Sequence, residues 1–231
     1  MSRSEPAQAP EIALLLARVP VIPVLTLETP EIAVPLARAL VQGGLAVLEI
    51  TLRTDAALEA ARAIMAEVEG AIVGLGTVVS EAQMRAARRA GARFAVSPGT
   101  TPRLLAAASE AGMPYLPGAA SASEIQALLE RGYSNLKFFP AEALGGVGAL
   151  KALAAPFREV RFCPTGGIDA AKARGYLALP SVPAVGGSWV APAERIAARD
   201  WLAITALAAQ AAALKRTGAG PAAPQISADF Q

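Results

Sequence analysis

One lysine stands in an unusual setting for a charged side chain. Lys137 follows Leu136 and precedes two phenylalanines, and this apolar run ends at Pro140. A run this short that stops at proline predicts a buried strand rather than a helix. Burial disfavours the charged ammonium form, and a neutral amine is the nucleophile that forms Schiff bases with ketones. The alternatives are a lysine whose head reaches solvent from a strand end and a lysine that pairs with an acid.

The residue types that the chain lacks narrow the chemistry. There is no histidine and only one cysteine, Cys163, so a Ser-His or Cys-His nucleophile cannot form and a transition metal lacks its usual ligands. General acid–base catalysis then falls to a carboxylate, a lysine, a tyrosine or water. Glu49 is a candidate because it interrupts the apolar run from Val47 to Ile50. It would act as a base or form half of a core ion pair. We expect no metal and no organic cofactor.

Alternating strands and helices must position these groups. Apolar strands without polar alternation, separated by helical patterns, indicate a parallel sheet covered by helices. A helix over residues 11–18 is expected before the first strand, the last strand is expected over residues 182–185, and a long helix follows at roughly residues 201–215. The eight predicted strand centres are Val24, Val47, Val73, Ala95, Leu116, Phe138, Phe162 and Val185.

The spacing of these centres indicates the fold. Successive centres lie 21 to 26 residues apart, and eight such even units predict a (β/α)8 barrel, or TIM barrel. A doubly wound open sheet is the alternative, but it would rarely keep eight units so even. Ser121 and Asp169 are suited to cap the helices that follow them, and Thr54 or Asp55 is expected to cap a helix over residues 55–67.

Polar and glycine-rich positions of this apolar chain fall at predicted strand ends. In a barrel, catalytic residues lie at the carboxyl ends of the strands, so we expect these side chains to share one face. The turns after the seventh and eighth strands are where such barrels bind phosphate on backbone N–H groups, although two ordinary tight turns are the alternative. The candidate site residues are Glu49, Arg53, Thr77, Pro98, Lys137, Phe139, Thr165, Gly166, Gly167, Gly186, Gly187 and Ser188.

Length and composition bound the remaining possibilities. A chain of 231 residues with 54% hydrophobic residues suits one large α/β domain. We expect the barrel over residues 11–216, between a flexible arm at 1–10 and a flexible tail at 217–231. A net charge of +2 with scattered arginines gives no field for nucleic acid. No apolar run approaches the ~20 residues that cross a membrane. One cysteine and a poor signal-peptide pattern predict a cytoplasmic location.

Six segments of the chain together resemble the bacterial 2-keto-3-deoxy-6-phosphogluconate (KDPG) aldolases, class I enzymes of the Entner–Doudoroff pathway. The resemblance covers about residues 11–212, and its most specific parts are the lysine segment and the Cys-Pro-Thr-Gly-Gly-Ile segment. The segments are Val47-Leu-Glu-Ile-Thr-Leu-Arg53, Ile72-Val-Gly-Leu-Gly-Thr77, Val96-Ser-Pro-Gly99, Lys137-Phe-Phe-Pro-Ala-Glu142, Arg161-Phe-Cys-Pro-Thr-Gly-Gly-Ile168 and Gly186-Gly-Ser-Trp189.

The resemblance implies a role for several candidates. Lys137 would be the Schiff-base lysine and Glu49 the general acid–base. Arg53 and Thr77 would bind the pyruvyl part of a keto-acid phosphate substrate, and Thr165 would influence stereoselectivity. The resemblance also implies a homotrimer, and cleavage of the substrate to pyruvate and D-glyceraldehyde 3-phosphate.

Several other functions stay open from the sequence. Within the family, the substrate could be 2-keto-3-deoxy-6-phosphogalactonate or 4-hydroxy-2-oxoglutarate. Outside it, a phosphate-binding isomerase or synthase barrel would use the same glycine-rich turns without needing a buried strand lysine. A sugar-phosphate-binding barrel without aldolase activity would tolerate replacement of Lys137 by arginine.

Overall fold

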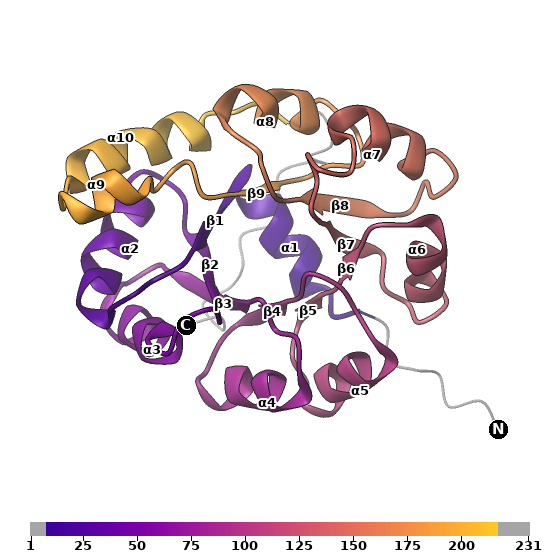
Figure 1. Cartoon of the computed structure of the whole chain (residues 1–231), viewed down its shortest axis with the longest axis horizontal. Helices are drawn as coiled ribbons and strands as arrows, with labels where there is room; N and C mark the ends of the chain where they lie inside the picture. The colour runs from indigo at the N-terminus through magenta and orange to yellow at the C-terminus, as the bar shows by residue number, and fades with distance from the viewer. Residues whose placement is uncertain (1–7, 217–231) are drawn as a thin grey trace.

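A ring of parallel strands surrounded by helices forms the molecule (Figure 1). The computed structural model describes residues 8–216. Every strand pairing in this part of the chain is parallel, and a helix follows each strand along the chain except β5, which leads directly into β6. The predicted (β/α)8 barrel is therefore confirmed. The predicted tail at 217–231 and the first seven residues of the predicted arm lie outside the described residues.

The strands pair in two hydrogen-bonded groups that close into one ring. The first group has the order β5-β4-β3-β2-β1-β9 and the second the order β6-β7-β8. A bridge between Thr165 and Gly186 joins β8 to β9. All eight predicted strand centres fall within these strands. Their bounds are β1 Val21–Leu25, β2 Val47–Thr51, β3 Ile72–Gly76, β4 Phe94–Val96, β5 Tyr115–Leu116, β6 Gly118–Ala119, β7 Asn135–Phe138, β8 Arg161–Pro164 and β9 Val185–Gly187.

The fifth barrel strand is divided into β5 and β6 at Pro117. Proline has no N–H to donate, so regular pairing stops at this residue. Before it, β5 pairs with β4; after it, β6 pairs with β7. The Pro117 carbonyl accepts a hydrogen bond from the backbone N–H of Lys137 at 2.8 Å. The change of partner thus fixes the backbone beside the lysine.

Helices cover the outside of the ring with their apolar faces. The predicted caps are confirmed at Ser121, which accepts from the backbone N–H of Glu124, and at Asp169, which accepts from two N–H groups of its helix. A 3₁₀ turn, η1 Pro30–Ile32, precedes α2. The helices are α1 Glu11–Arg18, α2 Ala33–Gln42, α3 Ala57–Glu67, α4 Glu81–Arg89, α5 Pro102–Glu110, α6 Ala122–Leu129, α7 Gly146–Ala154, α8 Ala170–Leu177, α9 Ala193–Ala197 and α10 Trp201–Ala212.

Three local predictions were wrong. Helix α3 begins at Ala57 without a side-chain cap, because the Thr54 hydroxyl instead donates to the Leu27 carbonyl at 2.5 Å. The last strand begins at Val185 rather than at residue 182, because the Val182 backbone N–H donates to the Leu179 carbonyl at 3.0 Å and not to a neighbouring strand. The short helix α9 was not predicted, and α10 ends at Ala212 rather than near residue 215.

The N-terminal helix α1 lies at the amino-terminal end of the strands. Gln8, just before it, donates its side-chain amide to the carbonyls of Tyr115 and Asn135, the first residues of β5 and β7. Its side-chain oxygen accepts from the Asn135 backbone N–H at 2.8 Å. Figure 1 shows α1 behind the middle of the ring. The mouth at the opposite, carboxyl-terminal end is left for the polar strand-end residues.

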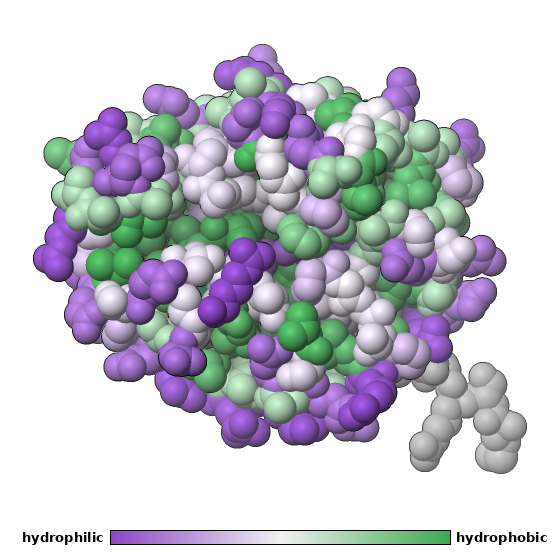
Figure 2. Space-filling view, viewed as in Figure 1, coloured by the Kyte–Doolittle hydropathy of each residue, from purple (hydrophilic) through white to green (hydrophobic). Residues whose placement is uncertain are grey.

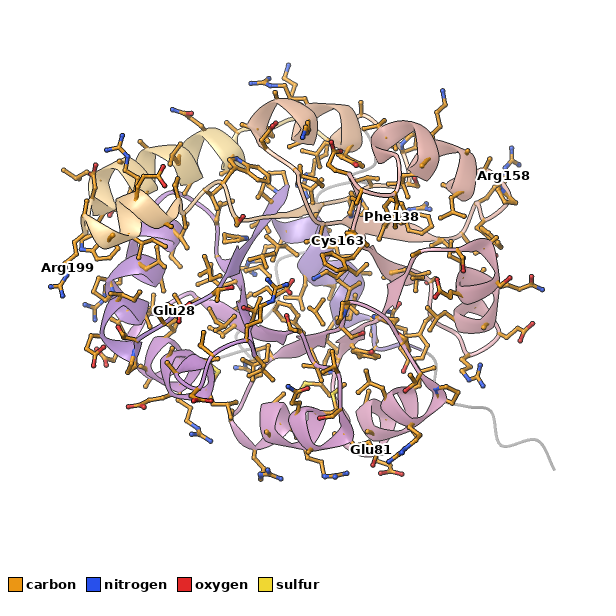
Figure 3. All side chains as sticks on the ribbon, in the orientation of Figure 1. Glu28, Glu81, Phe138, Arg158, Cys163 and Arg199 are labelled. Atoms are coloured by element: carbon orange, nitrogen blue, oxygen red, sulfur yellow. The ribbon has the colours of Figure 1, made fainter. Side chains whose placement is uncertain are left out.

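Residues of each strand alternate between the inside of the ring and the helix layer. Figure 3 shows Cys163 near the centre of the ring and Phe138 between the ring and the helices. Figure 2 shows strongly hydrophilic side chains mainly around the rim of this face, over the helices. No helix among residues 8–216 is long and apolar enough to span a bilayer.

Candidate active site

Lys137 and Glu49 form an ion pair inside the barrel. Lys137 lies in β7 and Glu49 in β2, and both point inward. The lysine Nζ is 3.0 Å from Glu49 Oε1 and 3.4 Å from Oε2. Lys137 is 5% exposed and Glu49 3% exposed. Lys137 therefore pairs with an acid, and Glu49 is half of an ion pair. Neither fact removes a catalytic role, because the carboxylate lies where it can take a proton from the amine.

Gly76 makes room for the Glu49 carboxylate. A Cβ atom at this position, the last residue of β3, would lie 2.1 Å from Glu49 Oε1. Real Cβ atoms do not approach an oxygen so closely, so any side chain here would push the carboxylate away from Lys137. The glycine in the segment that ends β3 thus sets the position of an acid on the neighbouring strand.

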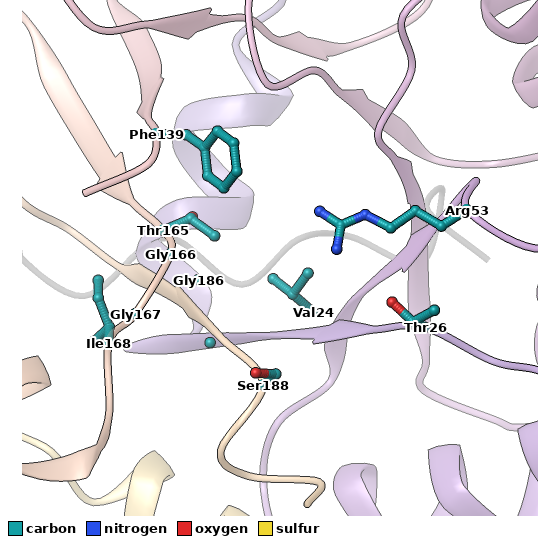
Figure 4. A pocket seen from close by; sticks show the side chains of 11 residues that line it. Val24, Thr26, Arg53, Phe139, Thr165, Gly166, Gly167, Ile168, Gly186 and Ser188 are labelled. Carbon is teal, nitrogen blue, oxygen red and sulfur yellow. The ribbon is translucent and has the colours of Figure 1, made fainter. Parts of the chain in front are cut away.

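Arg53 and Thr77 meet at the mouth, one beyond β2 and the other beyond β3. Arg53 Nε donates to Thr77 Oγ1 at 3.3 Å. Thr77 has a φ of 58°, which is a strained backbone conformation for a β-branched residue and costs roughly 1–3 kcal/mol. In this conformation the Thr77 hydroxyl lies beside the Arg53 side chain and accepts its hydrogen bond. Figure 4 shows the Arg53 guanidinium reaching into the pocket, where it can bind a carboxylate in bidentate geometry.

A pocket of about 220 Å³ opens beside the ion pair. It brings together eight of the predicted site residues: Arg53, Phe139, Thr165, Gly166, Gly167, Gly186, Gly187 and Ser188. Lys137 is linked to the pocket by Phe139, whose ring centroid lies 5.5 Å from the lysine Nζ. The ion pair is thus adjacent to the pocket and almost completely shielded from solvent.

Some residues differ from the predicted lining. Pro98 is not among the residues that line this pocket; its carbonyl lies against Gly118, the β6 residue in register with Lys137. Three lining residues were not predicted, namely Val24, Thr26 and Ile168. Val24 lies in the apolar strand β1 and Thr26 follows directly after it. Such a sequence looks the same whether its residues line a pocket or pack in the core, so neither residue was predicted.

The turn after β8 presents backbone donors to the pocket. Gly166 and Gly167 have φ values of 104° and 74°, which glycine adopts without strain. Within residues 8–216, the backbone N–H groups of Gly166, Gly167 and Ser188 have no protein acceptor. Free N–H groups in a turn that leads into helix α8 are suited to bind an anion such as phosphate.

Three polar residues, one in the loop before α7 and two on α8, hold this turn in position. The Glu142 backbone N–H donates to the Gly166 carbonyl at 3.1 Å, and the Lys172 ammonium donates to the Gly167 carbonyl at 3.0 Å. Glu142 in turn accepts from Tyr176 Oη at 2.7 Å and pairs with Lys172 at 3.1 Å. The Tyr176 hydrogen bond, with help from Lys172, holds the pKa of the Glu142 carboxyl below its usual range. We name Glu142, Lys172 and Tyr176 the turn clamp.

Cys163 lies beside Lys137 but is not suited to catalysis. The two residues are in register on β8 and β7, and burial raises the pKa of the Cys163 thiol to about 12. A protonated thiol is a poor nucleophile. The lysine amine is therefore the nucleophile that this end of the barrel offers.

The fold and site together define a barrel enzyme whose chemistry lies at the carboxyl ends of the strands, and comparisons with known proteins give its class as an aldolase. The sequence model "KDPG and KHG aldolase" matches residues 12–207. The chain belongs to this family.

Relatives of known structure or function match this chain over nearly the whole barrel. The KHG/KDPG aldolase of Escherichia coli strain K12 is 53% identical over 192 residues, which are 83% of this chain and 90% of the relative. The KDPG aldolase of Zymomonas mobilis ZM4, solved with 3-phosphoglycerate, is 48% identical with a TM-score of 0.87, over 91% of this chain and 99% of that one. The KDPG aldolase of Legionella pneumophila, solved with pyruvate as a covalent carbinolamine, is 45% identical with a TM-score of 0.84, over 86% and 97% of the two chains.

Proposed function

We propose that this protein cleaves 2-dehydro-3-deoxy-6-phosphogluconate, another name for KDPG, to pyruvate and D-glyceraldehyde 3-phosphate through a Schiff base on Lys137. The observation that carries the proposal is the buried Lys137–Glu49 pair at 3.0 Å, beside a pocket with a guanidinium on one side and free N–H donors on the other. A covalent pyruvate adduct in the Legionella relative supports it. The proposed steps need no metal.

The lysine provides the electron sink. Its neutral amine attacks the C2 ketone of the substrate. The proton that the ammonium released leaves with the carbinolamine hydroxyl as water, and a protonated imine remains beside the ionised Glu49. The C4 hydroxyl then loses its proton, and the electrons of the C3–C4 bond move into the imine. Glyceraldehyde 3-phosphate leaves and an enamine of pyruvate remains on the lysine.

Glu49 moves the protons of these steps. Directly or through a water molecule, it accepts the C4 hydroxyl proton and returns a proton to C3 of the enamine. Water then hydrolyses the imine, which releases pyruvate and restores the amine. Arg53 and Thr77 hold the substrate carboxylate, and the N–H groups of the Gly166 turn and Ser188 hold the phosphate.

A substrate panel tests this function. We expect purified protein to release pyruvate from KDPG, measured by coupled reduction of pyruvate, with lower kcat/KM on the phosphogalactonate isomer and on 4-hydroxy-2-oxoglutarate. The unphosphorylated sugar acid should lose roughly 10- to 100-fold in kcat/KM, because charge-assisted hydrogen bonds to the phosphate are lost. Equal activity with and without the phosphate would contradict the phosphate site, and no pyruvate from any member would contradict the aldolase proposal.

Weakening the turn clamp should affect the phosphate end alone. We expect Tyr176→Phe to raise KM for KDPG on the order of threefold, because Glu142 loses a hydrogen bond that positions the Gly166 turn. The rate of pyruvate trapping by borohydride should not change, because Lys137 is untouched. A matched rise in KM for the unphosphorylated substrate would show that Tyr176 acts on the whole fold instead.

We also propose that the enzyme works as a homotrimer, in the cytoplasm and in the Entner–Doudoroff pathway. The support for all three is the family resemblance, and a single cysteine agrees with a reducing compartment. Light scattering checks the assembly: about three times the chain mass of 23.5 kDa is expected, and a monomer or dimer at working concentration would exclude the trimer.

A further inference from the structure

We propose that Thr26 accepts a hydrogen bond from the C5 hydroxyl of the substrate and so selects aldehydes that carry a hydroxyl beside the carbonyl. This inference rests on the proposed function and deepens it. It gives a role to one of the three lining residues that the sequence did not single out.

The direction of a hydrogen-bond chain carries the argument. Thr51 Oγ1 lies 3.0 Å from the Leu25 carbonyl oxygen and 2.9 Å from Thr26 Oγ1. A carbonyl only accepts, and a hydroxyl has one proton. Both bonds form only if Thr51 donates to Leu25 and Thr26 donates to Thr51. The Thr26 oxygen then has lone pairs to offer and no proton left to give.

Thr26 offers these lone pairs to the pocket. Thr51 is completely buried, which holds the chain of bonds in place, whereas Thr26 is exposed and lines the pocket. Figure 4 shows the Thr26 hydroxyl on the same side of the pocket as Arg53. The side chain therefore acts as an oriented acceptor at the pocket wall.

The strand order places Thr26 between the proposed sites for the two charged ends of the substrate. Strand β1 lies between β2, which leads to Arg53, and β9, which leads to Ser188. A substrate whose carboxylate is at Arg53, whose C2 is bound to Lys137 and whose phosphate is at Ser188 fills the pocket that Thr26 lines between β2 and β9. Between C2 and the phosphate lie the C3 methylene and the C4 and C5 hydroxyls, and only the two hydroxyls can donate a hydrogen bond.

Chemistry distinguishes among these substrate groups. Ionised carboxylate and phosphate oxygens are acceptors, so an acceptor-only threonine does not suit them. The C4 hydroxyl gives its proton to Glu49 in the proposed mechanism. The C5 hydroxyl is the donor that remains, and it becomes the C2 hydroxyl of glyceraldehyde 3-phosphate. 4-Hydroxy-2-oxoglutarate has a carboxylate carbon there and lacks this donor.

Aldol addition of pyruvate to two aldehydes tests the inference. The aldehydes are D-glyceraldehyde 3-phosphate and its 2-deoxy analogue, and the measured quantity is the ratio of their kcat/KM values. Loss of one neutral hydrogen bond should lower this ratio about fivefold in Thr26→Val, which has the same shape. Thr26→Ser keeps the hydroxyl and should keep the ratio. Borohydride trapping with pyruvate checks that each variant is folded.

The outcomes separate this inference from the proposed function. An unchanged ratio in Thr26→Val, including an equal loss on both aldehydes, would overturn the role of Thr26 while leaving the aldolase intact. A ratio lowered equally in Thr26→Ser would show that shape, not the hydroxyl, matters, and would also overturn it. If the unaltered protein added neither aldehyde to pyruvate, the proposed function would fail and this inference with it.

Discussion

Replacement of Lys137 by arginine is expected to reduce KDPG cleavage below detection. Arginine keeps a positive charge beside Glu49, so the buried carboxylate stays paired. Leaving that carboxylate without a partner would by itself destabilise the fold by about 3–5 kcal/mol. A guanidinium does not lose its proton in proteins and cannot form the imine. The measurement is turnover at saturating substrate, with circular dichroism to confirm the fold. Lys151→Arg is the matched control, because Lys151 is exposed on α7, and it should keep full activity.

Borohydride extends this test to the unaltered protein. Added with pyruvate, it is expected to inactivate the enzyme permanently and to leave a reduced pyruvyl adduct on Lys137, located by peptide mass spectrometry. The other three lysines, Lys151, Lys172 and Lys215, are exposed. An adduct on any of these, or full activity after treatment, would contradict the Schiff-base proposal.

Glu49→Gln is expected to lower kcat for KDPG cleavage by roughly 10²–10⁴-fold, the range for a positioned general acid–base. Glutamine has the shape of glutamate and fits the space that Gly76 leaves, but it cannot accept the C4 hydroxyl proton. The amide oxygen can still accept a hydrogen bond from Lys137, so the fold should persist. Borohydride with pyruvate should still modify the lysine, which separates loss of proton transfer from loss of the nucleophile.

The control for this substitution is Glu59→Gln, which makes the same chemical change on the exposed face of α3. We expect that variant to match the unaltered enzyme. Near-normal turnover in Glu49→Gln would move proton transfer to another group. Loss of the pyruvate adduct as well would mean that the carboxylate is needed to form the imine, not only to break the C3–C4 bond.

The barrel was predictable because the chain repeats one unit. Each unit buries an apolar strand against the next, so strand centres such as Val24 and Val185 could be placed from spacing alone. The shared face of Lys137 and Glu49 followed from the fold. Their contact did not, since the residues are 88 positions apart and the pairing of two inward side chains depends on the closure of the ring.

Features that depend on several units at once could not be predicted. The segment from Val182 to Val185 has strand composition, but Pro183 lacks the N–H that pairing requires, and the ladder with β1 starts at Val185. The turn clamp combines side chains from the loop before α7 and from α8, which no local pattern relates. Thr26 follows an apolar strand as an ordinary polar residue, and only its bond to Thr51 gives it a direction.

The buried ion pair has a consequence for the charge inside the barrel during the proposed reaction. An ammonium and a protonated imine each carry one positive charge, so Lys137 and its covalent intermediate present the same charge to Glu49. Creating a new isolated charge in a low-dielectric interior is unfavourable by several kcal/mol. Here the counter-ion is already in place when the chain folds, so the reacting nitrogen can pass from free lysine to imine beside the same fixed negative neighbour. The barrel thereby needs little electrostatic reorganisation as the electron sink forms.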